Sequence, residues 1–153
     1  EMTAKTVSGR QLAMTTTNGT RALKACAGTR RVWIGGFLNL SALGQAICDA
    51  RPERLLLVCA GTGDDSALED VLGAGALCDL LWDDLGQAAT DAARFARERY
   101  RDSGDQLLEV ASEASNARRL LGIAELMEVV SFCFQRDAFP VVGEMGGEGW
   151  VSA

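Results

Sequence analysis

Histidine is absent from the 153 residues of this sequence. Its absence excludes Ser-His-Asp and Cys-His nucleophilic catalysis, phosphorylation on histidine, and most zinc sites. A metal ion bound by this chain would depend on oxygen ligands, which favours magnesium, manganese or calcium.

Long apolar runs and an excess of positive charge are also missing. No stretch approaches the roughly 20 apolar residues that a membrane-spanning helix requires. The formal net charge of -6 argues against nucleic acid or an anionic membrane as a partner. A small anionic ligand remains compatible, because backbone N–H groups, a few arginines or a bridging cation can offset negative charge locally.

Paired cysteines of the CxxC type are absent, and the cysteine count is odd. The five are Cys26, Cys48, Cys59, Cys78 and Cys133. We interpret them as buried reduced thiols, which predicts a cytoplasmic protein.

Three apolar stretches each run into a loop rich in small polar residues and then into a helical pattern. They cover residues 11–15, 31–34 and 55–60. The last has six apolar residues without alternation, which is typical of a strand buried on both faces. This rhythm predicts parallel strands joined by helical crossovers, with ligands binding where the loops after the strands gather.

Helical periodicity is visible in seven further segments. They cover residues 21–27, 40–50, 67–81, 87–101, 105–111, 115–121 and 125–134. An edge strand is predicted at 141–142 and a glycine-rich flexible tail at 144–153, so that residues 1–143 form one domain. The predicted fold is a three-layer α/β/α arrangement with a mostly parallel sheet. Three central strands would leave open sheet edges, so we expect the fold to be truncated at its N-terminal side.

The loop after the first predicted strand has the composition of an anion cradle. Asn18-Gly19 favours a tight turn with positive φ, which lets successive N–H groups converge. The hydroxyls of Thr17 and Thr20 and the guanidinium of Arg21 would complete a phosphate site. The alternative is an ordinary strand-to-helix turn with a threonine cap. Neither GxxxxGK[ST] nor GxGxxG occurs here.

The loops after the other two strands also carry polar side chains. Asn39 and Ser41 follow the second strand, as helix caps or as ligand-binding groups. Glu69 and Asp70 follow the third strand. Their carboxylates either stabilise the N-terminus of the next helix through its dipole or bind a Mg²⁺ ion. Ser66 and Glu69 also have capping-box spacing, which would give Glu69 a purely local role.

A basic segment in the helical half offers a further anion contact. Ser115-Asn116-Ala117-Arg118-Arg119 predicts a helix with two adjacent arginines. Adjacent arginines usually lie on a solvated face. The alternative is that Arg118 or Arg119 reaches an anionic group of a substrate.

Several ordered stretches together resemble the 2-phosphosulfolactate phosphatase family. They are residues 16–23, 36–42, 59–62 and 68–75, followed by 115–121 and 129–140. The resemblance implies an α/β enzyme that hydrolyses a phosphate monoester of a sulfonated hydroxy acid with Mg²⁺, releasing sulfolactate and phosphate. In methanogens this step belongs to coenzyme M biosynthesis.

Two departures from the family pattern affect these expectations. Family members carry a preceding segment, and Glu1 resembles the residue that follows it, so we expect the C-terminal two-thirds of a longer protein. Gly36 and Ala117 stand where relatives often have serine and glycine, which bears on substrate choice.

The resemblance implies a role for each candidate residue. Those expected to bind phosphate or substrate are Thr17, Asn18, Gly19, Thr20, Arg21 and Asn39. Glu69 and Asp70 would hold Mg²⁺ and serve catalysis. Without histidine, an acidic side chain or the metal must activate water, unless an aspartate outside these residues is the nucleophile.

Two other hypotheses stay open from the sequence. The chain is a non-catalytic anion-binding or interaction module, or it is a phosphatase for an unsulfonated ester. A homo-oligomer is compatible with either.

Overall fold

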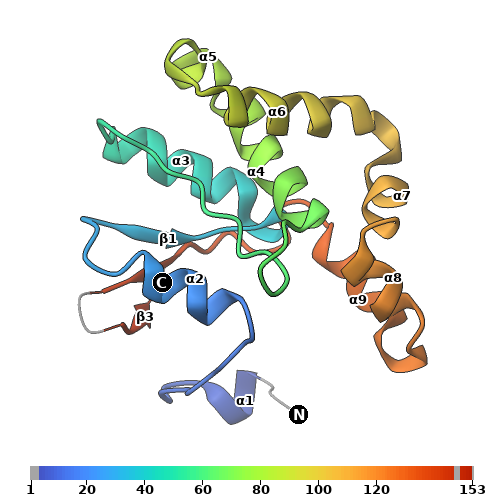
Figure 1. Cartoon of the computed structure of the whole chain (residues 1–153). Coiled ribbons are helices and arrows are strands. Elements are labelled where there is room, and N and C mark those ends of the chain that lie inside the picture. The colour runs from blue at the N-terminus through green and yellow to red at the C-terminus, as the bar shows by residue number, and fades with distance from the viewer. Residues whose placement is uncertain (1–3, 147–148, 153) are drawn as a thin grey trace.

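Helices dominate the protein, and a small sheet lies beside them (Figure 1). The computed structural model describes residues 4–146 and 149–152. The three longest helices are α3 (Leu40–Ala50), α4 (Leu68–Leu80) and α6 (Asp91–Ser103). Shorter helices are α1 (Ala4–Val7), α2 (Gly19–Ala25), α5 (Trp82–Leu85), α7 (Leu107–Ser112), α8 (Ser115–Leu121) and α9 (Met127–Cys133). Single 3₁₀ turns are η1 (Phe37–Asn39), η2 (Gly86–Ala88), η3 (Gly104–Gln106) and η4 (Ala124–Leu126).

The helices follow the sequence periodicity closely. Those over 40–50 and 115–121 have the predicted bounds. Helix α6 begins at Asp91 rather than at 87, because η2 precedes it and Thr90 caps it by accepting a hydrogen bond from the N–H of Ala93 at 3.4 Å. The predicted helix is therefore confirmed, but its first residue is set by the Thr90 cap.

The sheet differs from the predicted parallel one. Strands β1 (Val32–Ile34), β2 (Gly143–Met145) and β3 (Val151–Ser152) pair in that order, and both pairings are antiparallel. A turn between β2 and β3, in which Gly146 donates to the carbonyl of Trp150 at 2.8 Å, brings the last two strands together. A short hairpin supplies an antiparallel partner locally, whereas parallel pairing needs a distant strand.

Several strand predictions need correction. Residues 11–15 and 55–60 join no ladder in the described part of the chain. The edge strand starts at Gly143 instead of covering 141–142. The stretch predicted as a tail, 144–153, contains strand residues of β2 and β3, while 147–148 and 153 lie outside the described residues.

The main core lies between α3, α4 and their neighbours. It is formed by Phe37, Leu40, Leu43, Ile47, Leu72, Ala76, Leu77, Leu81 and Ala111. Leu40, Leu43 and Ile47 of α3 are buried, while Ala46 is half-buried. Ala114, Ala117 and Val130 form a second small cluster that joins α8 to α9. Leu68, the first residue of α4, packs against this second cluster and so joins it to α4.

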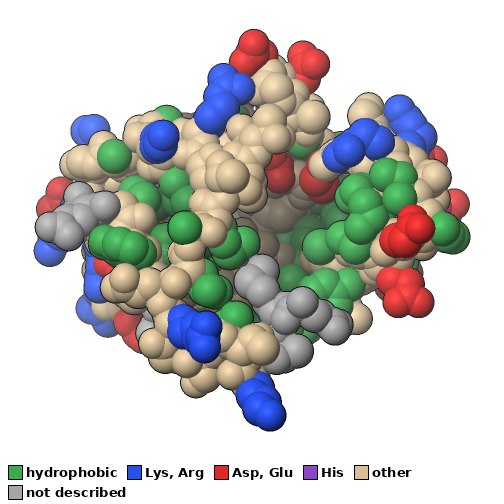
Figure 2. Space-filling view, turned by 90° about the horizontal axis from the view of Figure 1, so that it is seen from below, with side chains coloured by type: hydrophobic (Ala, Val, Ile, Leu, Met, Phe, Trp, Pro, Cys, Tyr) green, Lys and Arg blue, Asp and Glu red, His purple; other side chains and the backbone are tan. Residues whose placement is uncertain are grey.

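Apolar side chains remain exposed along the predicted third strand. Leu56 is 81% exposed and Val58 48%, while Leu55 and Leu57 pack against the main core. Figure 2 shows hydrophobic side chains bordering a central hollow on the face seen from below. Residues 55–58 thus have one covered face and one bare face.

The cysteines were predicted to be buried and reduced. All five thiols are free, but Cys59 and Cys133 are exposed, which corrects the expectation of burial.

None of the helices in the described part of the chain is both long enough and apolar enough to cross a membrane.

Candidate functional site

The loops after the first and third apolar stretches contact each other directly. Asn18 Oδ1 accepts a hydrogen bond from the N–H of Gly63 at 3.1 Å. Arg21 donates to the carbonyl of Gly63 at 3.2 Å and pairs with Asp64 at 3.1 Å. The ion pair is largely exposed and contributes little stability by itself. Together these contacts bring two predicted site segments, more than 40 residues apart, to one place.

Asp70 holds the same loop from its other side. Its carboxylate accepts a hydrogen bond from the N–H of Gly61 at 2.7 Å. Burial raises the pKa of Asp70 above its usual range; the Glu69 charge acts in the same direction, and the bond from Gly61 opposes it. Gly61 has a φ of 71°, and a Cβ there would lie 2.6 Å from the carbonyl oxygen of Asp65. The loop therefore requires glycine at this position.

The start of α2 contains the other predicted phosphate-binding residues. The N–H of Thr20 donates to Thr16 Oγ1 at 3.2 Å, and the hydroxyl of Thr20 donates to the carbonyl of Thr16 at 2.5 Å. Asn18 is the N-cap residue, but its side chain bonds to Gly63 instead of capping. Thr17 is exposed and Gly19 begins the helix.

Asn39 occupies a different, fully bonded position. Its Oδ1 accepts from the N–H of Gly36 at 3.0 Å, and its Nδ2 donates to the carbonyls of Ile34 and Val141. These contacts support a structural role in joining the end of β1 to the chain before β2. The predicted capping of α3 by Ser41 is wrong, because Asp137 accepts from the N–H of Ser41 at 2.6 Å and from its hydroxyl at 2.7 Å.

Glu69 is not engaged in the local cap that its spacing allowed. Helix α4 begins at Leu68, its N-cap is Ala67, and no side chain caps it. The predicted capping box between Ser66 and Glu69 is therefore not formed. Glu69 instead lines a cavity of about 300 Å³.

That cavity brings the third loop against the turn between α7 and α8. Its wall consists of Thr62, Asp65, Ser66, Ala67, Leu68, Glu69, Glu113, Ala114, Ser115 and Asn116. The volume is at the lower end of the range for small-molecule sites. We take this cavity as the candidate functional site.

The charge of the cavity constrains its ligand. Asp65, Glu69 and Glu113 are acidic, and no arginine or lysine is among the lining residues. A phosphate group alone would be repelled by these carboxylates, whereas a phosphate accompanied by a divalent cation would not.

The donor set is compatible with Mg²⁺ held partly by its ligand. Within residues 4–146 and 149–152, no three Asp, Glu or Cys side chains are placed to hold a metal ion together. Mg²⁺ is commonly bound through one or two carboxylates together with substrate phosphates and water. Glu69 is the predicted ligand that faces the cavity, while Asp70 is already bonded to Gly61.

Sequence reasoning missed part of this wall. Thr62, Ser66 and Glu113 were not proposed as site residues, and for Ser115 and Asn116 only the neighbouring arginines were considered. Thr62 and Ser66 follow an apolar stretch, which is a usable signal. Glu113 carries no such signal, because only the packing of α7 against α4 brings it to the cavity.

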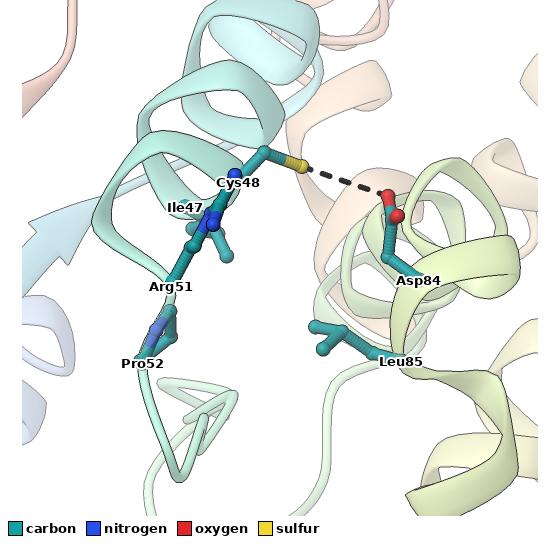
Figure 3. Close-up of a pocket in the computed structure, with 6 residues that line it drawn as sticks. All are labelled: Ile47, Cys48, Arg51, Pro52, Asp84 and Leu85. Carbon is teal, nitrogen blue, oxygen red and sulfur yellow. Dashed lines mark hydrogen bonds between the residues drawn. The ribbon is translucent and has the colours of Figure 1, made fainter.

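A larger cavity lies away from the predicted site residues. It has a volume of about 410 Å³ and is lined by Ile47, Cys48, Arg51, Pro52, Asp84 and Leu85 (Figure 3). Cys48 faces Asp84 across it, with Sγ and Oδ2 3.8 Å apart. Burial and the neighbouring Asp84 raise the pKa of the Cys48 thiol, so this thiol is a poor nucleophile.

Comparison with known proteins covers nearly all of the sequence. The family model described as 2-phosphosulpholactate phosphatase matches residues 1–148. A probable 2-phosphosulfolactate phosphatase of Symbiobacterium thermophilum is 33% identical over 136 residues, which are 88% of this chain and 58% of that protein. One of Thermotoga petrophila is 38% identical over 138 residues, covering 89% of this chain and 57% of the relative.

A third relative aligns with a longer part of this chain than the first two. A probable 2-phosphosulfolactate phosphatase of Caldanaerobacter subterraneus is 30% identical over 145 residues, or 95% of this chain and 59% of its own length. The chain thus spans less than two thirds of each of these three relatives. Since the family model matches 148 consecutive residues, this chain belongs to the 2-phosphosulfolactate phosphatase family.

Proposed function

We propose that the protein is a Mg²⁺-dependent phosphatase that hydrolyses 2-phosphosulfolactate, or a similar small phosphate ester, to the hydroxy acid and phosphate. The observation that carries this proposal is the convergence of Asn18, Arg21 and Asp70 on one loop beside the cavity that Glu69 lines. Family membership supports the reaction class.

The proposed roles differ with the contacts that each side chain already makes. Asn18 and Arg21 fix the loop at Gly63 from the α2 side, and Asp70 fixes it at Gly61. Thr17 is exposed just before α2, and the half-buried Gly19 and Thr20 begin the helix; we assign these three residues to phosphate binding. Asn39 has a structural role in this proposal, because its side chain is already bonded to Gly36, Ile34 and Val141.

Glu69 carries the proposed metal-binding role. When bound, Mg²⁺ would neutralise charge on the phosphate oxygens and so lessen repulsion from Asp65, Glu69 and Glu113. Because the pKa of Asp70 is raised, this carboxyl is the candidate to take or return a proton near the third loop. The free thiols are compatible with a cytoplasmic location.

Substitution of the two acids tests this assignment. Glu69→Gln and Asp70→Asn keep the side-chain shapes, and each is expected to lower kcat/KM for phosphate release by roughly 10²-fold or more. In the absence of Mg²⁺, the carboxyl of Asp70 should titrate above the ordinary range of an aspartate, because burial raises this pKa, and that titration should be missing in Asp70→Asn.

A matched control is Glu98→Gln on the exposed part of α6, which should leave the rate unchanged. Near-native rates in both Glu69→Gln and Asp70→Asn would remove these residues from the mechanism.

The competing function is a non-catalytic anion-binding or interaction module. The intramolecular bonds that already engage Asn18, Arg21 and Asn39 favour an interaction module, because they occupy groups that an anion would need. Calorimetry with phosphate and with sulfolactate, each with and without Mg²⁺, separates the two. Binding without turnover supports the module, whereas turnover supports the phosphatase.

A further inference from the structure

The connection between α3 and α4 contains an apolar segment whose backbone has no partner. Figure 1 shows this connection as an extended chain, and residues 55–58 within it make no hydrogen bond to the described part of the protein. Leu55 and Leu57 pack on the main core, while Leu56 is 81% exposed and Val58 48%. The segment therefore offers another chain both a backbone edge and the bare face formed by Leu56 and Val58.

The residues on either side confine any pairing to a short stretch. Pro52 has no N–H to donate, and Gly61 has a φ of 71°, which lies outside the range of an extended strand. Asp70 also engages the backbone of Ala60 and Gly61. A partner strand can therefore pair only along residues 53–59.

The two ends of the segment carry opposite charge. Arg51 and Arg54 outweigh Glu53 on its N-terminal side, and Asp64 and Asp65 follow on its C-terminal side. Arg54 and Asp65 are exposed, and neither side chain forms an ion pair with the described residues. Two antiparallel copies would set the basic end of each beside the acidic end of the other, whereas parallel copies would bring like charges together. The segment is thus complementary to itself.

We propose that residues 55–58 form a dimerisation edge, on which a second copy of the chain pairs antiparallel about a two-fold axis at Leu57. In an antiparallel pair, residues directly opposite each other point to the same face. With Leu57 opposite its counterpart, Leu56 of each copy lies opposite Val58 of the other, so that both bare residues gain an apolar neighbour. Such a contact uses the same surface on both copies and closes at a dimer. This inference is independent of the proposed phosphatase function.

Charge reversal with rescue tests the interface. In sedimentation velocity, the wild-type 153-residue chain should show a concentration-dependent equilibrium between monomer and dimer. Arg54→Asp and Asp65→Arg should each raise the dimer dissociation constant by roughly fivefold or more, because each replaces two attractions of the symmetric dimer by repulsions. The double variant should return to within about twofold of wild type, because the attractions are restored with their signs exchanged. Asp65 is preferred to Asp64, whose carboxylate already pairs with Arg21 at 3.1 Å.

Glu98→Arg on α6 is the matched control for these variants. It changes the net charge as Asp65→Arg does, at an exposed position outside the segment, and should leave the dissociation constant unchanged. A wild-type chain that stays monomeric at every concentration would leave the bare face to a different partner and overturn the inference. A double variant that associates as weakly as the single ones would overturn it too.

Disulfide cross-linking tests the register separately. The exposed native thiols, Cys59 and Cys133, are first replaced by serine, and Leu56→Cys protein is then mixed with Val58→Cys protein. Opposite residues have Cα atoms about 4.5–5.5 Å apart, within reach of a disulfide, whereas residues offset by two positions lie about 7–8 Å apart. Oxidation should therefore link the mixture several times faster than either protein alone. Equal rates in the mixture and in the separate proteins would contradict pairing about Leu57.

Discussion

Asp137 connects two parts of the chain that are 96 residues apart in sequence. Its carboxylate accepts both hydrogen bonds that Ser41 offers, and its own N–H donates to the carbonyl of Phe37 at 3.0 Å. The hydrogen bonds from the Ser41 side chain and backbone lower the pKa of Asp137 below its ordinary value. The first turn of α3 is therefore capped from outside the helix.

This cap predicts a pH-dependent contribution to stability. Because the folded-state pKa is lowered, the contribution is present above the unfolded pKa and is lost as pH falls through the folded value. Asp137→Ala should lower the free energy of unfolding at pH 7 by about 1 kcal/mol. The difference from wild type, measured by urea unfolding, should shrink toward acid pH.

The exposed Asp102→Ala on α6 serves as the control and should have little effect at any pH. A constant difference between Asp137→Ala and wild type down to strongly acid pH would contradict the role of the ionised carboxylate.

At the scale of elements, the closest packing joins α4 to α6. A Cβ added to Gly75 would lie 2.1 Å from the carbonyl oxygen of Ala96 and 2.8 Å from Cβ of Tyr100. At Gly73, two residues earlier in the same helix, the nearest atom is a ring carbon of Phe37 at 3.9 Å. Of these two glycines, only Gly75 lies at a backbone contact. Helix α4 in turn carries Glu69 and Asp70, so this packing orients the candidate site.

Two alanine substitutions separate these glycines. Gly75→Ala should lower the free energy of unfolding by about 1–3 kcal/mol, because the added methyl group meets backbone that cannot move aside. Gly73→Ala should raise it by roughly 0.5–1 kcal/mol through helix propensity. Thermal and urea unfolding measure both. An equal effect of the two substitutions would contradict the close contact of α4 with α6.

At the scale of the whole molecule, residues 55–60 have an unusual environment for an apolar segment. They make no backbone–backbone hydrogen bonds to other described residues, and Leu56 and Val58 are exposed. Such a segment offers unpaired backbone N–H and C=O groups to another chain. The predicted parallel sheet is not formed by the described residues, whose three strands pair antiparallel.

The bare face predicts self-association of the 153-residue chain. Leu56→Lys and Val58→Lys should reduce its association in sedimentation velocity, because charge on an exposed edge opposes pairing. Their free energy of unfolding should stay within about 0.5 kcal/mol of wild type. Leu57→Ala, on the covered side, should instead destabilise by more than about 1 kcal/mol. A Leu56→Lys variant as unstable as Leu57→Ala would show that the face is covered.

Of the eight predicted site residues, Glu69 alone is among the residues that line the candidate cavity. The composition of the loops around Asn18 and Glu69 indicated an anion site, and the structure joins Asn18 to Gly63 and Asp70 to Gly61. The role of Glu69 was not decidable in this way, because its spacing fitted a capping box equally well. Only the observed start of α4 at Leu68 frees it for the cavity.

The sequence by itself determined the helices and the polar loops between them, because periodicity and turn composition act over a few neighbouring residues. Helices over 40–50 and 115–121 needed no distant partner to be predicted. The tertiary structure alone decided which strands pair, which side chain caps α3, and which residues of α8 meet the third loop. These features depend on contacts between segments far apart in the chain, and no local pattern encodes them.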